Sequence, residues 1–187
     1  FEMTKEYYPE FDMNYAQKLS LDFGLNINKK IKGLSTGYNS IYKIILALSS
    51  NAPIVFFDEP VLGLDANHRE LFYKALIDKY SERPATYVIS THLIEEASDI
   101  IERVVILKEG KLILDEDTET VLAGGYAVSG SAGAVDEFCK GKQILGQDVL
   151  GGLKTAYIKG QVRREEIPEN LELSKPDLQK LFIQLTN

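Results

Sequence analysis

An apolar run in this chain ends abruptly in two adjacent acids, Asp58 and Glu59, within Pro53-Ile-Val-Phe-Phe-Asp-Glu-Pro60. The four hydrophobic residues from Ile54 to Phe57 lie between prolines and predict a strand buried on both faces of a parallel sheet. Open α/β sheets place ligand chemistry at the carboxyl ends of such strands. Two acids at that point are costly unless a cation or a reaction uses them. We therefore expect catalysis or metal binding there.

Three other short motifs accompany these acids. Leu34-Ser-Thr-Gly-Tyr38 comes before them and opens an amphipathic run, while Gly63-Leu-Asp65 and Ser90-Thr-His92 come after them. The start of a helix presents free N–H groups and partial positive charge, which favour an anion. His92 ends its strand as Asp58 ends its own, so we expect both side chains at one edge of the sheet.

The order and spacing of the four motifs resemble the second half of an ATP-binding cassette (ABC) ATPase, over roughly residues 6–120. In that family the motifs are the signature loop (typically Leu-Ser-Gly-Gly-Gln), the Walker B strand with its catalytic glutamate, the D-loop and the switch histidine. The resemblance implies ATP and Mg²⁺ as cofactors. It also implies an α/β fold: part of a P-loop NTPase-like doubly wound sheet, with a remnant of the helical subdomain before it and a small α+β unit after it.

The resemblance implies a role for each residue of the acidic strand end. Asp58 would hold Mg²⁺, directly or through water, and the ion would neutralise charge on the transferring phosphoryl group. Glu59 would orient and deprotonate the attacking water. His92 would contact the γ-phosphate and orient Glu59.

The resemblance assigns the remaining site residues to contacts with a second subunit. Ser35, Thr36, Gly37 and Tyr38 would grip the γ-phosphate of ATP bound to that subunit, and Asp65 would cross the dimer interface. The chain departs from the family pattern twice, because Thr36 replaces the first glycine and Tyr38 replaces glutamine. Thr36 brings a side chain to a place where backbone approaches phosphate closely, which puts the strength of that contact in question.

Simpler structural roles compete with these assignments. The two acids could cap a helix or pair with Arg69, Ser35 could be a plain N-cap of a core helix, and Asp65 could cap the helix that follows it. We expect His68 to be structural and Cys139 to be a buried hydrophobe. Two separated histidines and one cysteine do not give the spacing of a zinc site.

Helices and strands alternate around these motifs. Ile41, Ile44, Ile45 and Leu48 have the spacing of a core-facing helix, and Asp12 is a plausible N-cap for an earlier one. The expected elements in chain order are helix 12–23, the helix through Ser50, strand 54–58, helix 67–80, strand 86–90, helix 93–102 capped by Thr91, and strands 104–107 and 112–114 joined as a hairpin. This order predicts a doubly wound sheet with an antiparallel edge.

The pattern of the sequence changes near residue 120. We therefore expect two parts: residues 1–120, the C-terminal part of the nucleotide-binding domain, and residues 121–187, a small α+β appendage. Gly151-Gly152 suits a two-residue hairpin turn. The expected elements of the appendage are strand 126–129, helix 132–140, strands 143–149 and 153–159, and helix 175–186 with an apolar stripe of Leu178, Leu181, Phe182 and Leu185.

The composition limits the classes of function. The 187 residues are 44% hydrophobic and 26% charged, and their net charge of −7 argues against a general nucleic-acid binder. The single cysteine suits a reducing compartment. No apolar run approaches the roughly 20 residues that span a bilayer, and the first residues lack the layout of a signal peptide. We expect a cytoplasmic protein that meets the inner face of the cell membrane through a partner.

The sequence contains no Gly-x-x-x-x-Gly-Lys-Ser/Thr phosphate loop and begins with Phe. The simplest interpretation is a piece of a longer protein that begins after the first half of the domain, and we expect this piece alone to be inactive. The predicted function is part of the ATP-hydrolysing subunit of an ABC transporter. Its partners would be a transmembrane permease and a second ATPase subunit, identical or different. The alternative is a non-catalytic regulatory or interaction module derived from such an ATPase.

Overall fold

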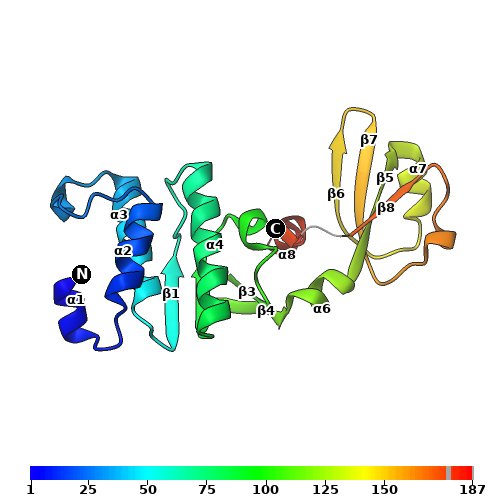
Figure 1. Cartoon of the computed structure of the whole chain (residues 1–187). Helices are drawn as coiled ribbons and strands as arrows, with labels where there is room; N and C mark the ends of the chain where they lie inside the picture. The colour runs from blue at the N-terminus through cyan, green and yellow to red at the C-terminus, as the bar shows by residue number, and fades with distance from the viewer. Residues whose placement is uncertain (176–177, 187) are drawn as a thin grey trace. The chain divides into compact units, whose positions relative to one another are not determined.

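The computed structural model describes residues 1–175 and 178–186. The chain divides into two compact units, Phe1–His92 and Leu93–Asn187 (Figure 1). This division falls before the change of composition near residue 120. The reason is that the hairpin that follows residue 102 packs with a short helix, which in turn packs with the sheet beyond it.

The first unit contains the helices that precede and connect its two strands. They are α1 (Glu2–Tyr7), α2 (Met13–Asp22), the short 3-10 helix η1 (Ile31–Gly33), α3 (Thr36–Ser49) and α4 (Ala66–Glu82). Asp12 caps α2, as expected, by accepting a hydrogen bond of 2.9 Å from the Tyr15 N–H. The predicted stripe of α3 is also confirmed, because Ile41, Ile44, Ile45 and Leu48 are all buried.

Two parallel strands, β1 (Ile54–Asp58) and β2 (Thr86–Ser90), flank α4 in the sequence and pair in register from Ile54–Thr86 to Asp58–Ser90. One face of the pair packs inward through Phe57, whose ring meets Phe72 of α4 edge-on at 5.3 Å. The other face is open, and Phe56 is 75% exposed. The prediction of a strand buried on both faces is therefore wrong, because a continuous apolar run does not specify which of its faces is covered.

The second unit begins with a short helix, α5 (Ile94–Ala97), and a hairpin of β3 (Arg103–Lys108) and β4 (Lys111–Asp117). The helix predicted for 93–102 is too long. The Ser98 hydroxyl donates to the Glu95 carbonyl at 2.9 Å, a local bond that competes with helix continuation. Within the described residues β3–β4 and β1–β2 form two separate sheets. The hairpin predicted for strands 104–107 and 112–114 is present as β3–β4, but neither of its strands pairs with β1 or β2 in the described residues, so the single sheet with an antiparallel edge is not formed.

A four-stranded antiparallel sheet fills the rest of the second unit, in the order β6-β7-β5-β8. Its elements, with the helices around them, are α6 (Thr118–Ala123), β5 (Gly125–Ser131), α7 (Ala132–Phe138), β6 (Ile144–Leu150), β7 (Leu153–Lys159), η2 (Arg164–Glu166), β8 (Glu172–Ser174) and α8 (Leu178–Thr186). Because β7 is antiparallel to both β5 and β6, the unit β5–α7–β6 is a split β-α-β arrangement.

The core of this sheet lies on the face that α7 covers. It includes Val128, Val135, Ala156 and Ile158, together with Cys139, which is buried as expected and whose thiol pKa is raised by that burial. Gly151-Gly152 forms the predicted hairpin turn, with Gly151 at φ +61°. The three-residue β8 was not predicted. Of the expected stripe on α8, Leu178 is buried and Phe182 half-buried, while the side chains of Leu181 and Leu185 lie outside the described part.

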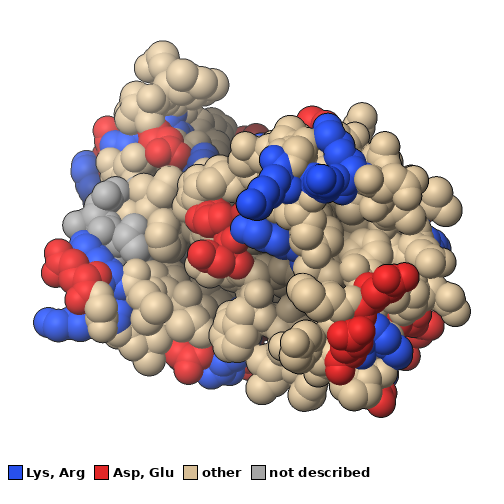
Figure 2. Space-filling model, turned by 90° about the vertical axis from the view of Figure 1, so that its left-hand side faces the viewer, with Lys and Arg blue, Asp and Glu red and all other residues tan. Residues whose placement is uncertain are grey.

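The surface of the molecule carries both signs of charge. Figure 2 shows a face on which Lys and Arg lie in small groups beside Asp and Glu, with most of the area uncharged. Among the described helices, none combines the length and the apolar character needed to cross a membrane.

Candidate functional site

Glu59 has a backbone conformation that residues with a side chain rarely adopt. Its φ is +44°, immediately after β1 ends at Asp58. For a residue with a Cβ this left-handed conformation costs on the order of 1–2 kcal/mol. The Glu59 N–H donates to the Ser90 carbonyl at 2.8 Å and the Glu59 carbonyl accepts from Leu62 at 3.1 Å, so the flanking structure holds the strained turn in place. Strain that the surroundings maintain in this way is concentrated at functional sites.

The carboxylate of Glu59 is held by the segment that follows β2. The Glu59 Oε1 atom lies 2.7 Å from the Nδ1 atom of His92 and accepts a 3.1 Å hydrogen bond from the His92 backbone N–H. The Oε2 atom accepts from the Thr91 hydroxyl at 3.0 Å. The parallel pairing of β1 with β2 produces this meeting, because it brings the carboxyl ends of both strands to the same edge.

These contacts also set the charge of Glu59. Burial alone would raise its pKa, but the hydrogen bonds from the His92 side chain, the Thr91 hydroxyl and the His92 backbone N–H act together to lower it. The carboxyl group is therefore ionised at neutral pH. The imidazole of His92 is itself largely exposed to solvent, so the pair forms a surface site with one side open.

Asp58 is exposed on the open face of β1, next to the Glu59 network. In the ranges 1–175 and 178–186, neither an ion pair nor a hydrogen bond involves its side chain. The same ranges contain no group of three or more His, Cys, Asp or Glu side chains that could hold a metal ion. A single exposed carboxylate is nevertheless a suitable ligand for Mg²⁺, which is usually held by one or two carboxylates together with waters and phosphates.

The signature-like segment forms the amino-terminal end of α3. Ser35 is the N-cap, and its hydroxyl accepts from the Tyr38 N–H at 3.4 Å, as the simpler reading of this serine expects. Thr36 is exposed. Gly37 lies against the Gly63-Leu-Asp65 segment of the same chain, since a Cβ atom at this position would stand 3.3 Å from the Gly63 carbonyl oxygen. The two motifs are thus in direct backbone contact.

Asp65 is the N-cap of α4, so the capping role weighed from the sequence is present in the structure. Its Oδ1 atom accepts from the His68 N–H at 3.0 Å, and its Oδ2 atom lies 2.8 Å from the His68 Nδ1 atom. These two bonds, the backbone one first, lower the pKa of Asp65.

His68 connects three elements of the first unit. Its ring stacks on Phe23, beyond the end of α2, at 6.2 Å and 14°, and it meets the Tyr38 ring of α3 edge-on at 6.2 Å and 72°. The structural role expected for His68 agrees with these contacts. They also show where Tyr38 goes, in the place of the family's glutamine: its ring packs within its own chain and is partly exposed.

Thr91 takes a different place from the one that the sequence predicts. We expected it to cap the next helix, but its hydroxyl donates to Glu59 instead, and α5 has no side-chain cap. The available signal was its position between Ser90 and His92, directly after a strand that pairs with β1. The stacking of His68 on Phe23 had no signal in the sequence.

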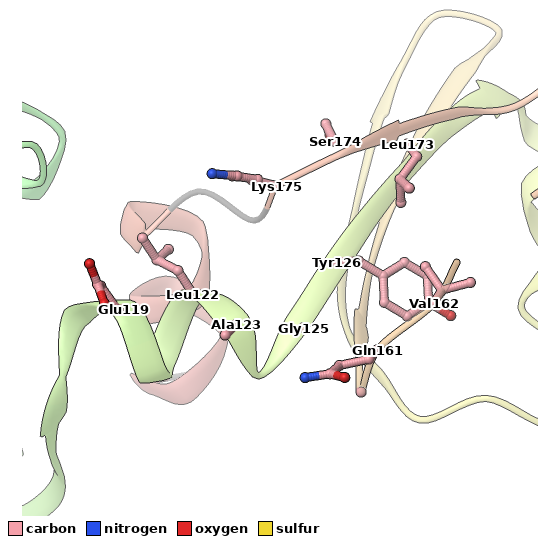
Figure 3. A pocket seen from close by; sticks show the side chains of 11 residues that line it. Glu119, Leu122, Ala123, Gly125, Tyr126, Gln161, Val162, Leu173, Ser174 and Lys175 are labelled. Carbon is pink, nitrogen blue, oxygen red and sulfur yellow. The ribbon is translucent and has the colours of Figure 1, made fainter. Parts of the chain in front are cut away.

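The second unit has a hollow of its own, of about 670 Å³. Figure 3 shows Glu119 and Leu122 of α6 on one side, and Tyr126, Val162, Leu173 and Lys175 around the edge of the sheet. Its lining is mainly apolar and includes none of the residues predicted from the sequence as site residues.

Comparison with known proteins gives a consistent result. The chain is 27% identical over 118 residues to the ABC transporter ATP-binding protein YtrB of Bacillus subtilis, covering 62% of this chain and 40% of the relative. It is 36% identical over 101 residues to an uncharacterized ABC transporter ATP-binding protein of Methanocaldococcus jannaschii, covering 50% and 38%. No family model matches the sequence.

Solved structures resemble the fold as well. An ATP-binding subunit of an ABC transporter matches with a TM-score of 0.57 at 20% identity, over 64% of this chain and 52% of that one. A dimeric bacterial ABC transporter cassette matches with a TM-score of 0.50 at 29% identity, over 56% and 46%. The P-loop NTPase-like α/β fold class is thereby confirmed. The chain spans about two fifths of the length of the first curated relatives that it matches.

Proposed function

We propose, from the premise that this chain is related to ABC transporter ATP-binding proteins over half to two thirds of its length, that it forms part of the ATP-hydrolysing subunit of such a transporter. The observation that carries the proposal is the Glu59–His92 contact of 2.7 Å at the shared edge of β1 and β2. Residues 33 positions apart meet there around a strained backbone. A mere surface ion pair does not need that strain.

The chemistry follows from the groups at that edge. Glu59, ionised and fixed by three hydrogen bonds, accepts a proton from an attacking water and orients it. His92 holds the Glu59 carboxylate in position, and its exposed ring is the group that would contact the γ-phosphate. Asp58 is the residue that would hold Mg²⁺, and a bound Mg²⁺ would neutralise negative charge on the phosphoryl group. These positions on strand ends give the fixed geometry that such chemistry requires.

The signature-like end of α3 is proposed to contact ATP held by a second subunit. Ser35, Thr36 and Gly37 are positioned at a helix start, where N–H groups and the helix dipole favour a phosphate. Asp65 lies in the loop that touches this helix start through Gly63. Tyr38 is the weakest member of the set, because its ring packs on His68. The second ATPase subunit could be identical or different.

The remaining assignments follow from the same proposal. The partner that ATP hydrolysis drives would be a transmembrane permease, and the protein would act at the inner, cytoplasmic face of the membrane. Because the sequence contains no Walker A phosphate loop, we propose that this chain alone neither binds ATP tightly nor turns it over.

The test is phosphate release from ATP by two samples: the 187-residue chain and the complete gene product that contains it. The proposal predicts turnover that depends on Mg²⁺ in the gene product and none in the chain beyond a background that Glu59→Gln leaves unchanged. Turnover by the purified chain that Glu59→Gln abolishes would overturn the statement that the chain alone is inactive. A gene product without Mg²⁺-dependent turnover would overturn the proposed function.

A non-catalytic module derived from such an ATPase is the second candidate. The observation in its favour is the altered signature, since Thr36 adds a side chain at the helix start and Tyr38 packs against His68. The same measurement separates the two candidates. A gene product that binds ATP but releases no phosphate would favour the module.

A further inference from the structure

The two carboxylate oxygens of Glu59 are held unequally. The Oε1 atom has two donors, the backbone N–H of His92 at 3.1 Å and the Nδ1 atom of its ring at 2.7 Å. Among the contacts within residues 1–175 and 178–186, the Oε2 atom accepts one hydrogen bond, from the Thr91 hydroxyl at 3.0 Å. An ionised carboxylate only accepts, with about two lone-pair sites on each oxygen. Both sites of Oε1 are therefore filled, and Oε2 keeps one site for a further donor.

The free site on Oε2 is the place where an attacking water can donate. A general base has to lie within about 2.6–3.2 Å of the group whose proton it takes. The Glu59 side chain is 30% exposed, so solvent reaches the carboxylate. Since His92 occupies Oε1, the direction in which Oε2 points decides whether a water can meet the base.

The contacts on Oε1 alone do not fix the plane of the carboxylate. The last torsion of a glutamate side chain moves in a broad, roughly two-fold well and has no narrow preferred value. Two donors on one oxygen hold that oxygen, while the other oxygen can still move around it. The Thr91 hydroxyl supplies an anchor on the second oxygen, and this anchor fixes the direction of the free site.

The main chain beside Thr91 is tied to the same strained turn. The Ser90 carbonyl accepts from the Glu59 N–H at 2.8 Å, and the His92 N–H donates to Oε1. Three successive residues thus hold the backbone and both carboxylate oxygens of Glu59. Threonine is β-branched and restricted in its first side-chain torsion, so Thr91 holds its hydroxyl in place better than an unbranched side chain would.

Helix capping does not explain the position of this hydroxyl. The N-cap of α5 is Leu93, and no side chain caps that helix. The threonine at the other end of the strand gives a comparison, because Thr86 opens β2 and Thr91 follows its last residue. Thr86 is exposed and its backbone N–H donates to the Pro53 carbonyl at 2.9 Å. Of the two threonines, Thr91 is the one whose hydroxyl meets the carboxylate.

We propose that Thr91 is a positioning residue, whose hydroxyl fixes the Oε2 atom of Glu59 as the oxygen that receives the proton of the attacking water. In that step an O–H bond of the water breaks and its proton passes to Oε2. The water oxygen bonds to the γ-phosphorus, and the bond from that phosphorus to the departing ADP breaks. Thr91 keeps its own proton throughout. The inference rests on the proposed ATP hydrolysis and adds a residue to it.

The test measures kcat and KM for ATP in the complete gene product. Thr91→Val removes the hydroxyl and keeps the branched shape, so it should lower kcat about tenfold and change KM by less than about twofold. Thr91→Ser keeps the donor and should retain kcat within about threefold. The matched control is Thr86→Val, the same change at the start of β2, which should leave both constants unchanged.

A double variant tests whether Thr91 acts through Glu59. Thr91→Val added to Glu59→Gln should slow turnover by less than about twofold beyond Glu59→Gln alone, because the base that Thr91 positions is already absent. A full tenfold loss in that background would overturn the proposal. It would also be overturned by a Thr91→Ser variant as slow as Thr91→Val, or by a Thr91→Val variant that raises KM and leaves kcat unchanged.

The same variants separate this inference from the function on which it rests. If Glu59→Gln lowers turnover and Thr91→Val does not, the role of Thr91 alone is wrong. If Glu59→Gln keeps full turnover, the catalytic role of Glu59 is wrong and the inference fails with it. Urea unfolding of the 187-residue chain shows whether Thr91→Val is folded. Should it not fold, Thr91→Ala makes the same test, and an alanine variant with the original kcat would overturn the proposal.

Discussion

The first unit contains two carboxylate–histidine pairs of nearly equal length, which differ in sequence separation, backbone conformation and surroundings. Glu59 and His92 are joined at 2.7 Å across 33 positions of sequence, and Glu59 has a left-handed backbone. Asp65 and His68 are joined at 2.8 Å within one helical turn, and the backbone of Asp65 is extended. The ring of His92 faces solvent, whereas that of His68 lies between Phe23 and Tyr38.

The difference shows how a distance by itself fails to identify a functional pair. The Asp65 pair satisfies the N–H of His68 in the first turn of α4, a structural role that stands beside the dimer contact proposed for Asp65. The Glu59 pair orders two strand ends at a backbone cost of about 1–2 kcal/mol and leaves one side of the histidine open. An arrangement that costs stability and exposes its reactive groups suits chemistry; one that buries its ring and caps a helix suits structure. The variants below separate the two.

The largest expected effect comes from Glu59→Gln in the complete gene product. Its turnover should fall about 10²–10⁴-fold, because an amide cannot act as general base, while nucleotide affinity stays near its original value. Asp65→Asn, the matched change in the other pair, should lower turnover less than Glu59→Gln does, because an asparagine still caps the helix. Equal losses in both variants would show that the two pairs do not differ as argued.

Replacing the two histidines should affect the free energy of unfolding in the opposite order, with the larger loss at the Asp65–His68 pair. His68→Ala should lower the free energy of unfolding by about 1–3 kcal/mol, because it removes two ring contacts and the bond to Asp65. His92→Ala should change it by less than about 0.5 kcal/mol, as is usual at exposed positions. Urea unfolding of the 187-residue chain measures both. A larger loss of unfolding free energy in His92→Ala than in His68→Ala would contradict the structural role given to the Asp65–His68 pair.

The cap itself should give a smaller effect. Asp65→Ala should cost about 1 kcal/mol in the same unfolding experiment, and Asp65→Ser should recover most of it, because serine is also a good N-cap. Failure of serine to recover stability would mean that the bond from the Asp65 carboxylate to the His68 ring, which serine cannot replace, carries the effect.

The smallest effect is on the dependence of stability on pH. The pKa of Glu59 lies below its ordinary value of 4.5 in the folded chain, so its stabilisation is complete above that value and is lost as the pH falls through the folded pKa. The difference in unfolding free energy between the original chain and Glu59→Gln should therefore narrow below pH 4.5. A difference that widens in acid would contradict the direction of the shift.

The sequence predicted periodic elements well. The spacing of Ile41, Ile44, Ile45 and Leu48 gave α3 because a helix has to place such residues on one face, and Gly151-Gly152 gave a hairpin because only certain residues suit that turn. The acids at the end of β1 were found because carboxylates after an apolar run are costly without a use. These features depend mainly on residues that are close in the sequence, so the sequence alone is enough to predict them.

Features that depend on distant neighbours were missed. The apolar run at β1 did not reveal that Phe56 faces solvent, because coverage of a face depends on other elements. Threonine is a common helix cap, but the Thr91 hydroxyl donates a hydrogen bond to Glu59, which lies 32 positions away in the sequence. The short β8 alternates over too few residues to be recognised. Whether a hydroxyl serves its own helix or a distant carboxylate is settled only when the strands pair.

A double-mutant cycle in the ATP turnover of the complete gene product measures whether Glu59 and His92 act as one catalytic unit. Groups that act as a unit give strongly non-additive losses. The double variant, Glu59→Gln with His92→Ala, should be no slower than the slower single variant, within about threefold. Losses that multiply, or single variants that both keep full turnover, would contradict it.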